Sequence, residues 1–207
     1  MNLTFFSGVI FALPSATMLE KLKAFYAQFS FLRPSDIASL IKISRIRSFE
    51  AGEVITQPGE KHYNFYVVLK GLLRNHIVST EGDECTIYLA TEGMVIGSAR
   101  TTMRDEESHE TTMAVEATWA AVVDGRRLLE LVDTNHRILR MYTESLKVNF
   151  YEAIERIEFH AVKTPEERYL YLLENRPELI QRVPQKYLAS FIGITPVSLS
   201  RIRARIK

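Results

Sequence analysis

Hydrophobic and polar positions follow three different patterns along the chain. From residue 18 to about residue 46, apolar side chains recur at intervals of three and four, which is the period of one helical face. From residue 49 to residue 123, short runs rich in β-branched and aromatic residues alternate with glycines, as in a series of short strands. Helical spacing returns near residue 126. The sequence therefore predicts an α+β protein that contains a β-sandwich or jelly roll (a double-stranded β-helix) followed by helices.

Two short helices joined by a tight turn are predicted between residues 185 and 204. Ala189 is small where two helix backbones approach, and Gly193 suits the left-handed conformation at the end of a helix. Thr195 offers an N-cap hydroxyl and Pro196 a preset first turn. The apolar positions that hold the pair together are Leu188, Ile192, Ile194, Leu199 and Ile202. This pattern predicts a helix-turn-helix, whose second helix enters the major groove of DNA.

The charge distribution agrees with DNA binding at this end. The whole chain carries a formal charge of +1, yet residues 185–207 contain basic residues and no acid. These basic residues are Lys186, Arg201, Arg203, Arg205 and Lys207. A basic end on a nearly neutral protein is typical of contact with phosphates. The simpler alternative is a helical hairpin with a solvated cationic end.

A long helix is predicted from about Thr134 to Ala161. Its apolar stripe comprises Ile138, Tyr142, Leu146, Phe150, Ile154 and Ile157. A helix of about 27 residues is about 40 Å long at 1.5 Å per residue. The stripe either covers the β-roll of its own chain or pairs with its twin from a second chain. We favour the second interpretation, since a two-fold reader of DNA needs a spacer between its two reading helices.

Composition excludes several classes of protein. A chain of 207 residues with 46% hydrophobic and 25% charged residues is typical of globular proteins, and no apolar run approaches the roughly 20 residues that span a bilayer. The lone Cys85 excludes an internal disulfide and favours a cytoplasmic setting. A metal-dependent cupin enzyme would need a His-x-His pair, and the sequence has none. No enzyme activity, metal site or cofactor is predicted.

The first 17 residues form a separate case. They contain a short apolar stretch and a proline but lack the basic start of a secretory signal. We expect that translation starts at Met18. The alternative is that residues 1–17 form a packed N-terminal arm.

A glycine-punctuated roll, a long helix and a helix-turn-helix, in this order, resemble the Crp/Fnr family of bacterial transcription regulators. The resemblance covers residues 32–206. It is carried by FEAGEVITQPGEKHYNFYVVLKGLLR (49–74), EGMVIGSA (92–99), AVEA (114–117) and VPQKYLASFIGITPVSLSRIR (183–203). Iron–sulfur and haem sensors of this family fit poorly, because the cysteine is single and the histidines are scattered.

The resemblance implies a division into three parts. These are a cyclic-nucleotide-binding-like sensor domain at residues 18–133, a dimerisation helix at 134–161 and a winged or helix-turn-helix DNA-binding domain at 162–207. It also implies a cytoplasmic homodimer that binds a pseudo-palindromic operator and contacts RNA polymerase. In such proteins an effector in the roll reorients the DNA-binding domains through the long helix.

The sequence departs from the family members that bind cyclic AMP. Those carry a Gly-Glu pair and, after a short helix, an Arg-Ser or Arg-Thr pair. Gly97-Ser98 and Thr111-Thr112 stand at these positions here, so the ribose-binding glutamate and the phosphate-binding arginine are absent. The intervening loop, residues 100–110, contains acids that would oppose a phosphate.

We therefore expect an effector other than cyclic AMP, or none. Arg100 or Arg104 replacing the lost cation is the alternative. The candidate effector pocket comprises Gly97, Ser98, Ala99, Arg100, Thr111 and Thr112.

Positions in the family motif also imply roles in DNA binding. Thr195 would cap the recognition helix and touch a phosphate, and Val197, Ser198 and Arg201 would meet base edges. Arg201 is the best candidate for guanine, because a guanidinium can donate to both O6 and N7. The candidate set is Thr195, Val197, Ser198, Ser200, Arg201, Arg203 and Arg205, of which the last two are expected at phosphates. A sensing module that has lost DNA binding is the remaining alternative.

Overall fold

The computed structural model describes residues 29–206, and predictions for residues 1–28 and 207 fall outside it. The strands are β1 (Ser44–Phe49), β2 (Val54–Thr56), β3 (Phe65–Lys70), β4 (Leu73–Val78), β5 (Glu84–Ala90), β6 (Val95–Ile96), β7 (Thr111–Ala114) and β8 (Thr118–Val123). The helices beside them are α2 (Pro34–Lys42), α3 (Ala99–Arg104) and α4 (Gly125–Thr134). The remaining helices are α5 (His136–Val162), α6 (Pro165–Asn175), α7 (Pro177–Arg182), α8 (Gln185–Ile192) and α9 (Pro196–Ile206).

The strands form two four-stranded antiparallel sheets, ordered β1-β8-β3-β6 and β2-β7-β4-β5. Buried side chains from both sheets make one core between them, for example Phe49, Val68 and Ala120 from the first sheet and Leu73 and Ala114 from the second. Burying such apolar surface is the main force that holds the layers together. The predicted α+β architecture with an antiparallel β-sandwich is confirmed.

The first strand lies partly where the sequence indicated helix. Helical spacing was predicted up to Ile46, but α2 ends at Lys42 and β1 begins at Ser44. All six residues of β1 pair with β8, from Ser44 opposite Val123 to Phe49 opposite Thr118. The ladder of backbone hydrogen bonds that this pairing provides overrides the local helical spacing.

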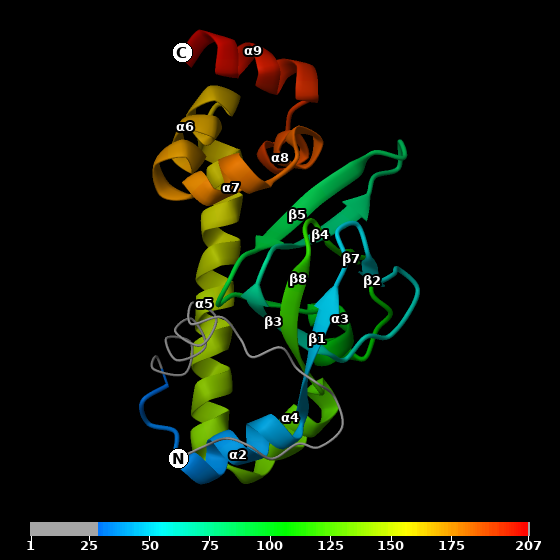
Figure 1. Cartoon of the computed structure of the whole chain (residues 1–207), viewed down its shortest axis with the longest axis vertical. Coiled ribbons are helices and arrows are strands. Elements are labelled where there is room, and N and C mark those ends of the chain that lie inside the picture. The colour runs from blue at the N-terminus through cyan, green and yellow to red at the C-terminus, as the bar shows by residue number, and fades with distance from the viewer. Residues whose placement is uncertain (1–28, 207) are drawn as a thin grey trace.

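The helix α5 runs beside the roll from the level of α2 and α4 to the C-terminal helices (Figure 1). At its start, Ile138 is fully buried and packs with Leu40 of α2 and Leu128 of α4, and Tyr142 lies against the same cluster. The predicted apolar stripe is therefore divided. Its first part is covered by its own chain, which corrects the interpretation of one continuous stripe, whereas Phe150 further along is 65% exposed.

The C-terminal part consists of helices packed around a common core. That core includes Phe159 of α5, Tyr169 of α6, Leu179 of α7, Leu188 of α8 and Leu199 of α9. Between residues 163 and 206 the structure has helices only, so it contains no wing hairpin within that segment. None of the described helices is both long and apolar enough to cross a membrane.

Candidate DNA-binding and effector sites

The turn between α8 and α9 has the geometry that its sequence predicted. Gly193 adopts φ 73° and ψ 39°, a left-handed conformation, and its N–H donates to the carbonyls of Ala189 and Ser190. Ile194 N–H donates to the Ala189 carbonyl at 3.0 Å. At the start of α9, Thr195 Oγ1 accepts from the Ser198 N–H at 3.2 Å, as an N-cap does. The two helices are thereby held at a fixed angle.

Burial separates an inner and an outer face of the α8–α9 pair. The five predicted apolar positions face inward: Leu188, Ile192 and Leu199 are completely buried, Ile202 is nearly so, and Ile194 packs against the same core. On the outer face, Thr195, Val197, Ser200 and Arg201 are exposed, and Ser198 is half-buried.

The three arginines of α9 have different surroundings. Arg201 is exposed, and no ion pair to it occurs within the described residues. Arg205 pairs with Glu166 of α6 at 3.0 Å but stays exposed. Arg203 turns inward, with its guanidinium 5.7 Å from the centre of the Tyr169 ring and its Nε buried without a partner. Arg201 is thus the freest of the three to meet a ligand.

Helix α8 is anchored on the β-roll. Ser190 Oγ accepts from the Thr86 N–H at 2.8 Å and donates to the Glu84 carbonyl at 2.7 Å. Arg74 of β4 is fully buried, and its guanidinium lies 3.9 Å from the centre of the Tyr187 ring. It also contacts Glu84 at 2.6 Å, which lowers the pKa of that carboxyl. These contacts fix the helix-turn-helix relative to the strands β4 and β5.

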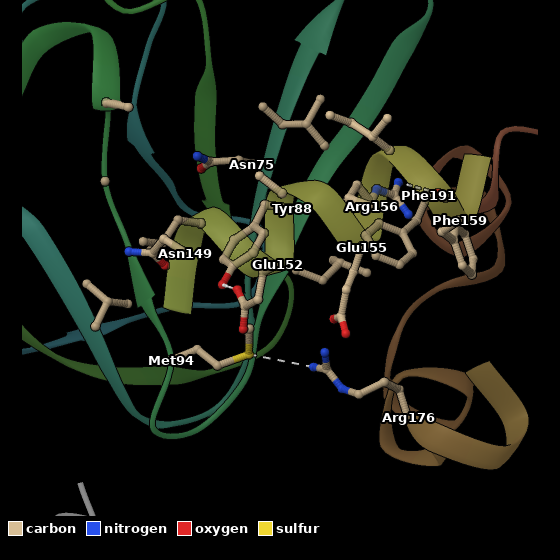
Figure 2. Close-up of a pocket in the computed structure, with 18 of the residues that line it drawn as sticks. Asn75, Tyr88, Met94, Asn149, Glu152, Glu155, Arg156, Phe159, Arg176 and Phe191 are labelled. Carbon is tan, nitrogen blue, oxygen red and sulfur yellow. Dashed lines mark hydrogen bonds between the residues drawn. The ribbon is translucent and has the colours of Figure 1, made fainter. Parts of the chain in front are cut away.

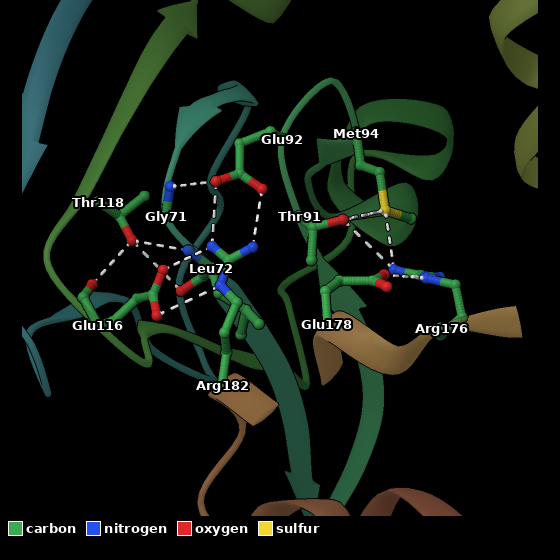
Figure 3. Close-up of polar contacts among 10 residues, drawn as sticks. All are labelled: Gly71, Leu72, Thr91, Glu92, Met94, Glu116, Thr118, Arg176, Glu178 and Arg182. Carbon is green, nitrogen blue, oxygen red and sulfur yellow. Dashed lines mark hydrogen bonds and ion pairs between the residues drawn. The ribbon is translucent and has the colours of Figure 1, made fainter. Parts of the chain in front are cut away.

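A cluster of charged side chains, here named the Arg182 clasp, makes a second anchor (Figure 3). Arg182 of α7 contacts Glu92 at 2.9 and 3.1 Å and Glu116 at 2.5 Å. Glu92 also accepts from the Gly71 N–H at 3.2 Å. Gly71 has φ 108°, and a Cβ there would lie 2.7 Å from the Thr118 Cα, so only glycine fits this approach.

The pKa of Glu92 reflects this environment. Burial alone would raise the pKa, but the hydrogen bonds and charge of Arg182, with the Gly71 amide, lower it to about 2. The carboxylate is therefore ionised at neutral pH and paired across the junction between the roll and the C-terminal helices.

A cavity of about 1090 Å³ lies between the roll and α5 (Figure 2). Its walls are largely apolar and include Phe65, Ile87, Leu89, Met94, Val95, Ile96, Met103 and Leu146. Polar side chains reach it from several elements: Asn75, Tyr88, Glu110, Asn149 and Glu152. An apolar cavity with a few convergent polar groups has the form of a small-molecule site.

Polar contacts organise the wall of this cavity. Thr112 Oγ1 donates to Asn75 Oδ1 at 2.7 Å, and Asn75 Nδ2 donates to Glu110 Oε2 at 3.2 Å. Burial raises the pKa of Glu110, although Arg100 and His109 oppose this. Tyr88 is the cross-strand neighbour of Asn75, and it donates to Glu152 of α5 at 2.5 Å.

Comparisons with known proteins identify the fold. Residues 46–135 match the family model of the cyclic nucleotide-binding domain. FixK2 from Bradyrhizobium japonicum is 19% identical, with a TM-score of 0.69 over 79% of this chain and 84% of that chain. A structure from Eubacterium rectale assigned to the Crp/Fnr family of transcriptional regulators is 16% identical, with a TM-score of 0.69 over 88% and 87%. The chain has the Crp/Fnr fold.

A further structure of this fold is CLP from Xanthomonas campestris, a global regulator that responds to c-di-GMP. It is 17% identical, with a TM-score of 0.67 over 84% of this chain and 91% of that chain. No curated protein sequence matches the chain. The resemblance to Crp/Fnr regulators that the sequence predicted is confirmed at the level of the fold.

The Crp/Fnr fold brings together some of the predicted effector-pocket residues. Gly97 and Ala99 line the cavity, and Ser98 caps α3 by accepting from the Thr101 N–H. Thr112 does not line the cavity but donates a hydrogen bond to Asn75, which does. Thr111 is the first residue of β7 and does not line the cavity either. The predicted loop at residues 100–110 is shorter than expected, because α3 includes its first part to Arg104.

The two arginines considered as replacement cations point elsewhere. Arg100 and Arg104 both pair with Glu106, at 3.2 and 3.5 Å, and neither lines the cavity. The acid Glu110, directly before Thr111, lines it instead. Within residues 29–206, no three histidine, cysteine or acidic side chains gather as a metal site would require.

Several site residues were not predicted from the sequence. Asn75 lies on β4, Tyr88 on β5, and Asn149 and Glu152 on α5. No motif in the sequence marks them, because only the packing of α5 against the roll brings these distant segments together. Glu110 carried one usable signal, since it is an acid next to the position of the missing phosphate ligand.

Proposed function

We propose that this chain is a homodimeric, DNA-binding transcription regulator of the Crp/Fnr type that does not respond to cyclic AMP. The observation that carries the proposal is the outward face of α9. It presents exposed Arg201 on a capped helix, next to a glycine turn of helix-turn-helix geometry. A guanidinium held in this way can donate two hydrogen bonds to guanine in the major groove.

The roles within α9 follow from exposure. Val197, 61% exposed, is placed to contact a thymine methyl, and Thr195, Ser198 and Ser200 can donate to phosphates or bases. Arg205 is proposed at a phosphate, where it would exchange Glu166 for the nucleic acid. Arg203 faces Tyr169, so its proposed phosphate contact requires the side chain to turn outward.

The exposed side chains of α5 support a dimer. Leu139, Phe150 and Ile157 are 39%, 65% and 67% exposed, and Leu146 is half-buried. Their spacing of seven, four and seven residues keeps them on one face, as in a coiled coil. Two such faces packed together would remove this apolar surface from water. A cytoplasmic location and contact with RNA polymerase are proposed on the family resemblance alone.

The cavity supports an effector other than cyclic AMP. The arginine that would neutralise a cyclic phosphate is replaced by Thr111, and Glu110 presents a carboxyl group to the same region. A phosphate placed there would be repelled rather than paired.

The experiment is selection of bound sites from random double-stranded DNA with the purified full chain and with Arg201→Ala. We expect a pseudo-palindromic site for the unmodified protein. The variant should retain only weak, salt-sensitive binding, because bidentate contacts to a base give about 1–3 kcal/mol of discrimination. Arg127→Ala is the matched control, since Arg127 is equally exposed but lies on α4, far from α9 (Figure 1).

Two results would count against the proposal. One is the absence of any sequence preference in the unmodified protein. The other is an unchanged ratio of specific to random binding for Arg201→Ala. The Arg205→Ala variant tests the phosphate role separately, because it should weaken binding to all sequences about equally.

A further inference from the structure

The cavity between the roll and α5 has an unequal distribution of charge. The acids that line it are Glu110 from the roll and Glu152, Glu155 and Glu158 from α5. Basic side chains line it too, but they contact the C-terminal helices. Arg156 donates to the Phe191 carbonyl and lies 3.6 Å from the centre of that ring, and Arg176 pairs with Glu178 at 2.6 Å. Within the described residues, none of the basic side chains that line the cavity pairs with Glu110.

The carboxyl group of Glu110 has few hydrogen-bond donors for a group in this position. Within the described residues, Asn75 is the side chain that hydrogen-bonds to it, and Asn75 is itself 4% exposed and fixed by Thr112. The charges of Arg100 and His109 act on Glu110 from outside the cavity, and Arg100 is paired with Glu106. Glu110 is half-buried, and a carboxylate in such a place with a single amide donor gains free energy when a cation reaches it.

The space beside Glu110 suits an apolar body. Phe65, Ile96 and Met103 line this part of the molecule near α3, and Tyr142 lines the facing side of α5. The volume of about 1090 Å³ is at the upper end of the usual range for small-molecule pockets.

We propose that this cavity binds a small molecule with an aromatic or otherwise apolar body and a protonated amine, which forms an ion pair with Glu110. Asn75 and the Tyr88–Glu152 pair add hydrogen bonds at the rim of the same space. This inference deepens the proposed regulator function, since it assigns the effector to a class opposite in charge to cyclic nucleotides.

The test uses three probes with the same indole body and different heads: tryptamine, tryptophol and indole-3-acetate. Binding to the purified full chain, in its own oligomeric state, is measured by titration calorimetry, without DNA. We expect tryptamine to bind most tightly and indole-3-acetate most weakly, with cyclic AMP not competing. A hydrogen bond between two charged groups is stronger than one from a neutral hydroxyl, so amine and alcohol should differ in affinity by roughly tenfold or more.

The variant Glu110→Gln keeps the shape of the side chain and removes its charge. We expect it to lower tryptamine affinity roughly tenfold or more, to about that of tryptophol, and to leave tryptophol binding unchanged. Glu107→Gln is the matched control, because Glu107 is an exposed acid of the same loop and does not line the cavity. It should bind all three probes as the unmodified protein does.

Four outcomes would overturn the proposal: no binding of any probe, equal binding of all three, a preference for the acid, or unchanged tryptamine affinity in Glu110→Gln. Competition by cyclic AMP would overturn it as well. None of these measurements involves DNA. Loss of sequence-selective DNA binding with intact amine binding would therefore refute the regulator function and leave this site standing.

Discussion

The Arg182 clasp provides the sharpest test of how the two halves of the chain are held together. We consider the substitution Glu92→Gln, which preserves the shape of the side chain and removes its charge. Glu92 is 13% exposed at its side chain and contacts Arg182 at 2.9 and 3.1 Å. The variant leaves Arg182 paired with Glu116 only, across the same junction (Figure 3).

The lowered pKa gives the magnitude. The pKa of Glu92 is about 2 in the folded protein, against an ordinary value of 4.5. One unit corresponds to about 1.36 kcal/mol, so the difference is about 3 kcal/mol, and about 2–3 kcal/mol after allowance for the partial exposure. Because the folded-state pKa is lowered, this stabilisation is fully present above about pH 4.5 and is lost as the pH falls towards 2.

The assay is urea unfolding at pH 7 and at pH 3, for the unmodified chain and for Glu92→Gln. We expect the variant to lose about 2–3 kcal/mol of unfolding free energy at pH 7 and less than half of that at pH 3. Glu178→Gln is the control. Its carboxylate pairs with Arg176 at 2.6 Å but is 36% exposed, so it should cost under about 1 kcal/mol.

A loss under about 0.5 kcal/mol for Glu92→Gln at pH 7 would refute the reasoning, because it would place the clasp among ordinary surface pairs. A loss of the same size at both pH values would refute it in a different way. It would mean that packing, and not the charge of Glu92, is responsible.

Three further predictions concern other parts of the molecule. Gly193→Ala should lower the unfolding free energy by about 1 kcal/mol and reduce DNA affinity, because φ 73° is strained for alanine and its Cβ would lie 3.2 Å from Arg168. Thermal melting measures the first effect and a gel shift the second. An unchanged melting temperature would contradict this prediction. Phe150→Glu should convert the proposed dimer to monomer in sedimentation, since it puts a charge on the exposed stripe, whereas Tyr151→Glu, on another face of α5, should not. Glu110→Gln should have an unfolding free energy at pH 7 at least as high as that of the unmodified chain, since burial raises the pKa of Glu110 and so disfavours its charged form. Clear destabilisation in a urea titration would show instead that the charge of Glu110 is needed for folding.

The α8–turn–α9 pair could be predicted from sequence because its determinants are local. Gly193, Thr195 and the apolar positions lie within about 20 residues of one another, and each acts on the backbone beside it. The start of α6 is similar, where Thr164 and Glu167 cap each other's backbone N–H groups. By contrast, β1 was assigned partly to a helix, because its state depends on β8, whose paired residues are 69 to 79 positions away in the sequence.

The clasp and the cavity depend on such distant contacts and could not be predicted. Glu92 and Arg182 are 90 positions apart, and nothing near either residue indicates the other. The same holds for Met94, which lines the cavity and whose sulfur accepts from Arg176 at 3.6 Å (Figure 2). Thr91, Glu92 and Met94 lie in one turn of the roll, so the cavity wall and the clasp are neighbours in the chain and both contact residues at α7. A ligand that displaced Met94 would remove its contact with Arg176, which directly precedes α7, and α7 leads into the α8–α9 pair that is proposed to read DNA.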